Sequence, residues 1–152
     1  MYYGNGSASD AQDAENVWDA NFVMVQHFQE TTGNHLDSTS NNNDTDTVSV
    51  TSQGTAAGKI GGADEFVRSS SDYVEVPHSS TLDLITYTIE FWFKADTPSV
   101  AIQSLVARGE DWTNDIAQWV IELDDAQNPD KIQLWYEESN DADHYYPTNT
   151  SI

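Results

Sequence analysis

The chain has no cysteine and few basic residues. Its 152 residues hold 5 lysines and arginines against 26 aspartates and glutamates, which gives a formal net charge of -21 at pH 7. Without cysteine, neither a disulfide framework nor a thiolate metal site can form. A surface this acidic repels phosphate backbones. We therefore expect no binding to nucleic acid.

Long apolar runs are also lacking. No stretch approaches the roughly 18 apolar residues that cross a membrane, and no signal peptide opens the chain. We expect no membrane insertion, and export would depend on a segment outside this sequence. The hydrophobic content is 38%, with 5 Trp, 7 Tyr and 5 Phe, which is enough for the core of one domain. The acidic surface suits a cation-rich setting, either calcium or high salt.

Short β patterns run through the chain. Residues 73–76 favour a strand that Pro77 closes, and residues 88–94 and 21–29 alternate as strands do. The run 33–46 is rich in Asn, Ser, Thr and Asp, which predicts a long surface loop. Ser9 and Gln12 have capping-box spacing, which predicts a short N-terminal helix over residues 10–18. Further strands are predicted at 48–51, 65–68, 104–108, 116–123 and 131–136. The pattern indicates an all-β sandwich.

The order of motifs between Gly58 and Lys94 is similar to that of a known family. These motifs are GKIGGA at 58–63, Phe66, DYVEVP at 72–77 and TIEFW at 88–92. They resemble the laminin-G-like, concanavalin A-like lectin and glucanase family, and the resemblance covers roughly residues 17–137. It implies a jelly-roll β-sandwich over residues 17–152.

The first residues resemble something else. Tyr2-Tyr3-Gly4-Asn5 looks like the last strand of a domain of unknown function that often precedes this family in secreted prokaryotic proteins. Residues 1–16 are therefore expected to be a junction or the end of a preceding domain.

The resemblance also implies strands beyond the last ones found here. Members of the family usually continue into a further strand, a hairpin and several more strands after a segment like 131–136. A jelly roll without its C-terminal strands would expose unpaired edges. We expect either that the chain is a piece of a longer polypeptide, or that another copy or chain completes the sheet.

Concanavalin A-like folds also include glycosidases with a Glu-x-Asp-x-x-Glu motif. Here Glu122 and Asp124 match its first two carboxylates, but Gln127 stands where the acid/base glutamate is needed. Retaining hydrolysis requires two carboxyl groups. The chain is therefore not expected to be an enzyme, although a glycoside hydrolase-like remnant stays open as an alternative.

Calcium is the best-motivated cofactor. Ca²⁺ prefers several oxygen ligands, which Asp, Asn and loop carbonyls supply. The predicted ligands lie in the polar loop 33–46: Asp37, Asn41, Asn43, Asp44 and Asp46. A second candidate group of ligands comprises Asp64, Asp72 and Glu75. The plainer interpretation of the polar loop is that its side chains are only solvated.

Exposed aromatic side chains flanked by amides or carboxylates are typical of glycan binding. Trp92 and Trp119 lie in predicted strands, which favours a place in the core. Each of the four histidines is expected to be structural or solvated. The predicted ligand-binding residues are Trp112, Asn114, Tyr145 and Tyr146, and the candidate N-glycosylation sites are Asn5, Asn43 and Asn149.

Together these features predict a non-catalytic binding or adhesion module at the cell surface or outside the cell. Its partner would be a glycan or an extracellular protein, and calcium would stabilise the module. The alternative is a structural subunit of an extracellular filament or surface layer, assembled by strand exchange.

Overall fold

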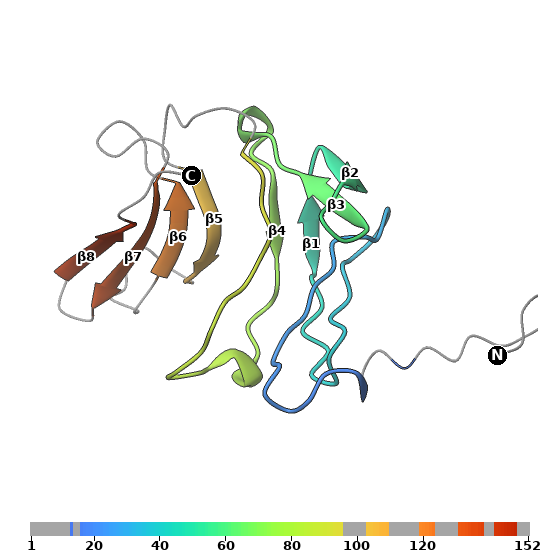
Figure 1. The fold of residues 1–152 in the computed structure, drawn as a ribbon, viewed down its shortest axis with the longest axis horizontal. Coiled ribbons are helices and arrows are strands. Elements are labelled where there is room, and N and C mark those ends of the chain that lie inside the picture. The colour runs from blue at the N-terminus through green and yellow to red at the C-terminus, as the bar shows by residue number, and fades with distance from the viewer. Residues whose placement is uncertain are drawn as a thin grey trace, which may run out of the picture. The chain divides into compact units, whose positions relative to one another are not determined.

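The computed structural model of the chain describes residues 13, 16–95, 103–109, 119–123, 131–138 and 142–148. The chain divides into two compact units, one up to Trp92 and the other from Phe93 (Figure 1). We call them the N-terminal unit and the C-terminal unit. The described secondary structure consists of small antiparallel sheets with only short 3-10 turns, so the all-β prediction is confirmed. No helix in the described part of the chain is long and apolar enough to cross a membrane.

The N-terminal unit contains two small sheets. Strand β1 (Thr47–Ser49) pairs with β4 (Tyr73–Glu75), and β2 (Ser52–Ala57) pairs with β3 (Gly62–Glu65). Two 3-10 turns, η2 (Arg68–Ser70) and η3 (Ser80–Leu82), follow β3 and β4. The strands predicted at 48–51 and 73–76 correspond to β1 and β4. The strand predicted at 65–68 is wrong, because β3 ends at Glu65 and η2 begins at Arg68.

Glycine is required where β2 and β3 lie against Gln29 and Glu30, just before the polar loop. Gly54 has a φ of +64°, and a Cβ there would lie 2.5 Å from the carbonyl oxygen of Glu30. A Cβ at Gly62 would clash with the carbonyl oxygen of Gly54. A side chain at Gly54 would push β2 away from the segment at Glu30, and a side chain at Gly62 would push β3 away from β2.

Two alternating segments do not form strands. Residues 88–94 carry no strand, and residues 21–29 hold only an isolated bridge between Gln26 and Asp37. Figure 1 draws both as ribbon without arrows. Both strand predictions are therefore wrong, because alternation shows what a strand could bury but not whether a hydrogen-bonded neighbour is present. Most of the predicted helix at 10–18 lies outside the described residues.

The C-terminal unit is one four-stranded antiparallel sheet in the order β5-β6-β7-β8. Its strands are β5 (Gln103–Arg108), β6 (Trp119–Leu123), β7 (Ile132–Glu138) and β8 (Ala142–Pro147). The first three correspond to predicted strands, while β8 was not predicted. The buried hydrophobic side chains among the described residues, Val120 and Leu123, both lie on β6.

Candidate functional site

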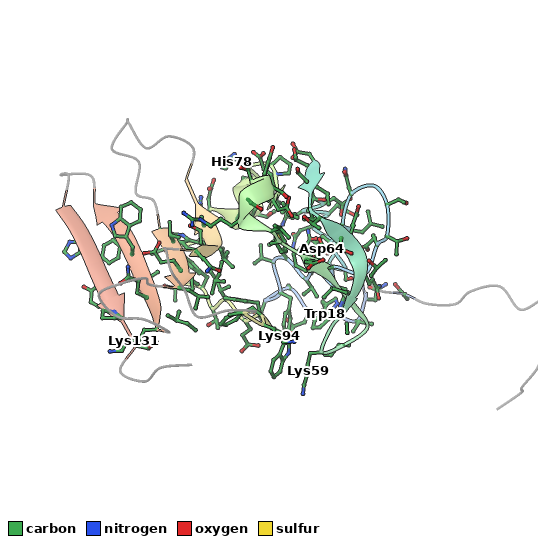
Figure 2. All side chains as sticks on the ribbon, turned by 90° about the horizontal axis from the view of Figure 1, so that it is seen from above. Trp18, Lys59, Asp64, His78, Lys94 and Lys131 are labelled. Carbon is green, nitrogen blue, oxygen red and sulfur yellow. The ribbon has the colours of Figure 1, made fainter. Side chains whose placement is uncertain are left out.

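The polar loop is the most buried part of the N-terminal unit. Five side chains within residues 35–45 are removed from solvent, and all of them are polar. This set comprises His35, Asp37, Thr39, Asn43 and Thr45. The loop prediction is confirmed, but its position at the surface is wrong for these five residues. Figure 2 draws the side chains of this region, with Asp64 labelled.

Asp37 holds this loop together. Its side chain accepts hydrogen bonds from the backbone amides of Val25 (2.9 Å), Thr39 (2.9 Å) and Asn43 (2.9 Å), and from the Thr39 hydroxyl (2.8 Å). The residue is only 7% exposed. Donors from two chain segments thus provide the hydrogen bonds that a buried carboxylate requires.

The other predicted calcium ligands also make protein contacts. Asn43 exchanges hydrogen bonds with the Thr81 hydroxyl at 3.0 and 3.1 Å, and Asn41 donates to the Val23 carbonyl at 3.1 Å. Asp44 accepts from the Asp37 amide at 2.7 Å, and the exposed Asp46 accepts from the Thr47 hydroxyl at 3.2 Å. A calcium ion at this loop would have to replace protein donors at Asp37 and Asn43. Calcium binding there stays a prediction.

The second predicted group is not brought together around one point. Asp64 contacts His35, whereas Asp72 accepts from the backbone amides of Thr51 (2.7 Å) and Val67 (2.8 Å). Hydrogen bonds from Thr51 and the Val67 amide lower the pKa of Asp72 below its ordinary value. Among the described residues, no three His, Cys, Asp or Glu side chains are arranged to hold a metal ion.

The buried ring of His35 lies between two carboxylates. Its Nδ1 is 2.8 Å from Glu30 Oε2, and its Nε2 is 2.7 Å from Asp64 Oδ2. His35 and Asp64 side chains are 0% and 1% exposed, and Asp64 also accepts from the Gly54 amide at 2.7 Å. Each ring nitrogen thus lies within hydrogen-bond distance of one carboxylate. We call these three residues the His35 cluster.

The His35 cluster ties the polar loop to the β2–β3 sheet. The Thr45 hydroxyl accepts from the His35 amide at 2.8 Å, and the Phe28 ring packs edge-on against the imidazole with centroids 4.9 Å apart. Burial acts to raise the pKa of Glu30, but the hydrogen bond and charge of His35, with backbone hydrogen bonds, bring it below its ordinary value. His35 was expected to be structural or solvated, and its position agrees with the first interpretation.

An aromatic stack lies on β7 and β8 in the C-terminal unit. The rings of Tyr136 and His144 stack with centroids 4.7 Å apart, and Tyr136 and Tyr146 stack at 5.9 Å with an interplanar angle of 2°. Tyr146, a predicted ligand-binding residue, is 56% exposed. Tyr136 and His144 were not predicted as its neighbours, since their contact depends on the register between the two strands. Trp112, Asn114 and the Tyr145 side chain lie outside the described residues.

The two tryptophans assigned to the core differ in exposure. Trp92 is 74% exposed, and the Nζ of Lys59 lies 5.4 Å from its ring centroid. The core prediction is therefore wrong for Trp92. Trp119 on β6 is half-buried.

Glu122, the candidate glycosidase carboxylate, is 8% exposed on β6. Its Oε1 accepts a hydrogen bond of 2.6 Å from Gln133 on the neighbouring β7, which is also buried. The corresponding positions Asp124 and Gln127 lie outside the described residues. The one described position of the motif, Glu122, is thus a carboxylate paired with an amide inside a sheet.

Comparison with protein-family models, curated proteins and solved structures finds no significant match.

Proposed function

We propose that the chain is a non-catalytic extracellular module that binds a glycan or a protein, built on a laminin-G-like jelly-roll sandwich. The observation that carries this proposal is Tyr146, a large aromatic side chain 56% exposed at the end of a ring stack on a four-stranded sheet. Exposed aromatic surface of this kind is typical of binding sites rather than of sheet interiors.

The state of Glu122 supports a binding role over catalysis. A glycosidase carboxylate must reach the sugar, whereas Glu122 is buried and hydrogen-bonded to Gln133 at 2.6 Å. We expect no turnover of polysaccharides by the chain. If turnover were found and the Glu122→Gln variant abolished it, the glycoside hydrolase alternative would replace this proposal.

The test is a binding screen with the whole chain. The labelled protein would be applied to a glycan array and to immobilised basic, acidic and neutral peptides. We expect saturable binding to at least one class. Binding to none of them would contradict the proposal.

Calcium is the proposed stabiliser, on the basis of the sequence of the polar loop. All five predicted ligands contact other protein groups, and Asp46 is the carboxylate best placed to take an ion there, because it is exposed and its contact with the Thr47 hydroxyl is long, at 3.2 Å. Thermal unfolding with calcium and then with a chelator tests this part. A midpoint unchanged by the chelator would remove calcium from the proposal.

Assembly by strand exchange is the second candidate function. It is favoured by the large apolar side chains that the N-terminal unit exposes, including Trp92, Ile60 and the fully exposed Ile85. Sedimentation over a hundredfold range of protein concentration would distinguish it. A concentration-dependent mass would favour the structural subunit, and a constant monomer mass would count against it.

A further inference from the structure

We infer that the β7–β8 surface around Tyr146 binds an arginine-rich segment of a partner protein. The inference rests on the proposed binding function and specifies its partner class. The surface consists of four side chains that face the same side of the sheet. We call it the Tyr146 face, and its residues are Leu134, Tyr136, His144 and Tyr146.

The register of the two strands creates this face. Tyr136 lies opposite His144, and Leu134 lies opposite Tyr146, so all four side chains project from one side. The three rings are close to parallel, with interplanar angles of 2–15°. Leu134 is also exposed. Because β8 is the last strand in the sheet order, Tyr146 stands on its edge strand (Figure 1).

The rings determine what kind of group can bind. The face of a tyrosine ring is electron-rich and attracts cations, and a planar guanidinium can also stack on it. The molecule already contains one such contact, because Lys59 lies over the exposed ring of Trp92 at 5.4 Å. An arginine side chain can lie on Tyr146 in the same way.

The charge of the chain selects a basic partner. The chain has 26 acidic residues and only 5 lysines and arginines, so it supplies few cations of its own. In the sequence from 131 to 148, which includes β7 and β8, Lys131 stands against four acidic residues: Glu137, Glu138, Asp141 and Asp143. Such a field attracts cationic segments and repels acidic ones. A neutral polysaccharide would gain nothing from this charge, so a basic peptide is the occupant that fits both features.

The experiment must separate the ring from the general acidic field. A fluorescent peptide of alternating arginine and serine would be titrated into the whole chain and three variants at fixed salt. Tyr146→Ala removes the ring, Tyr146→Phe keeps it, and Tyr73→Ala removes an equally exposed tyrosine from β4 as the matched control. None of the three changes the net charge, and far-UV circular dichroism would confirm that each variant folds.

We expect Tyr146→Ala to weaken binding about two- to tenfold, while Tyr146→Phe and Tyr73→Ala bind as the unmodified chain does. Equal weakening by both alanine variants, or by neither, would show that the peptide follows the acidic field alone and would overturn the inference. No peptide binding beside clear binding to a neutral glycan would also overturn it, yet leave the proposed binding function standing. Polysaccharide turnover would instead contradict the proposed function.

Discussion

The N-terminal unit removes polar side chains from water, whereas the C-terminal sheet buries Val120 and Leu123 beside the hydrogen-bonded pair Glu122 and Gln133. In the first unit the buried groups are joined by directional bonds, such as those that converge on Asp37. In the second, apolar area contributes as well. The two units should therefore respond to different perturbations.

The physical reason is that a substitution destabilises an apolar interior and a polar interior in different ways. Apolar burial is roughly proportional to the area removed from water, so truncation weakens it in proportion. A polar network stabilises only while each buried group keeps its partner, because an orphaned charge costs far more than the bond contributed. The His35 cluster is the sharpest example, since the Asp64 side chain is 1% exposed and lies 2.7 Å from the buried ring of His35.

Replacing His35 by glutamine should give the largest effect. The variant His35→Gln would leave two carboxylates, one of them buried, without the ring that lies between them. We expect a loss of about 3–5 kcal/mol of unfolding free energy, typical of a buried charged group that loses its partner. Urea denaturation measures the loss, and amide hydrogen exchange should place it in the N-terminal unit.

The matched control is His78→Gln. His78 also faces a carboxylate, Asp83, at 3.1 Å, but the two side chains are 57% and 47% exposed. That variant should lose no more than about 1 kcal/mol of unfolding free energy. Equal losses from the two variants would mean that burial of the His35 cluster does not determine its contribution.

The C-terminal unit should instead be sensitive to apolar truncation. Leu123→Ala removes a side chain that is 3% exposed, so we expect a loss of about 2–4 kcal/mol. Hydrogen exchange should then rise in β5 to β8 while the amides of the polar loop keep their protection. Leu134→Ala, which truncates a side chain of β7 that is 39% exposed, is the control and should lose less than about 1 kcal/mol of unfolding free energy. Equal loss of protection in both units would show that they unfold together and that the comparison does not hold.

The sequence predicted the sheet-forming parts better than the interior of the N-terminal unit. The segments that became β6 and β7 are apolar, and the residues of β4 precede a proline, so their local signals were sufficient. The alternation at 88–94 was equally clear, yet no strand formed there. Local periodicity does not specify a pairing partner.

The polar interior could not be read from hydropathy. His35, Asp37 and Thr39 alternate as buried strand residues do, but their polarity resembles that of a solvated loop. The His35 cluster joins residues 5 and 29 positions apart in the chain, which no spacing rule anticipates. At the aromatic stack, Tyr146 was predicted as a binding residue from its polar surroundings. That Tyr136 and His144 are its neighbours could be seen only from the register of β7 and β8.

Acid should distinguish the two interiors with a smaller effect. The pKa of Glu30 lies below its ordinary value of 4.5 in the folded chain, because the hydrogen bonds and charge of His35 and the backbone outweigh burial, which acts to raise it. A carboxylate with a lowered folded pKa contributes stability that is fully present above its unfolded value. That contribution is lost as the pH falls through the folded value. The midpoint temperature of thermal unfolding should therefore fall once the pH is below about 4.5, and the N-terminal unit should lose its amide protection first.

The variant Glu30→Gln tests the source of this acid sensitivity. It should lose about 1 kcal/mol at neutral pH, as expected for one hydrogen bond, and its stability should fall less steeply on acidification. Glu65→Gln, which removes an exposed carboxylate from β3, should keep the steeper profile of the unmodified chain. If the two variants gave the same acid profile, the sensitivity would come from the overall charge of the chain and not from the contact between Glu30 and the buried ring of His35.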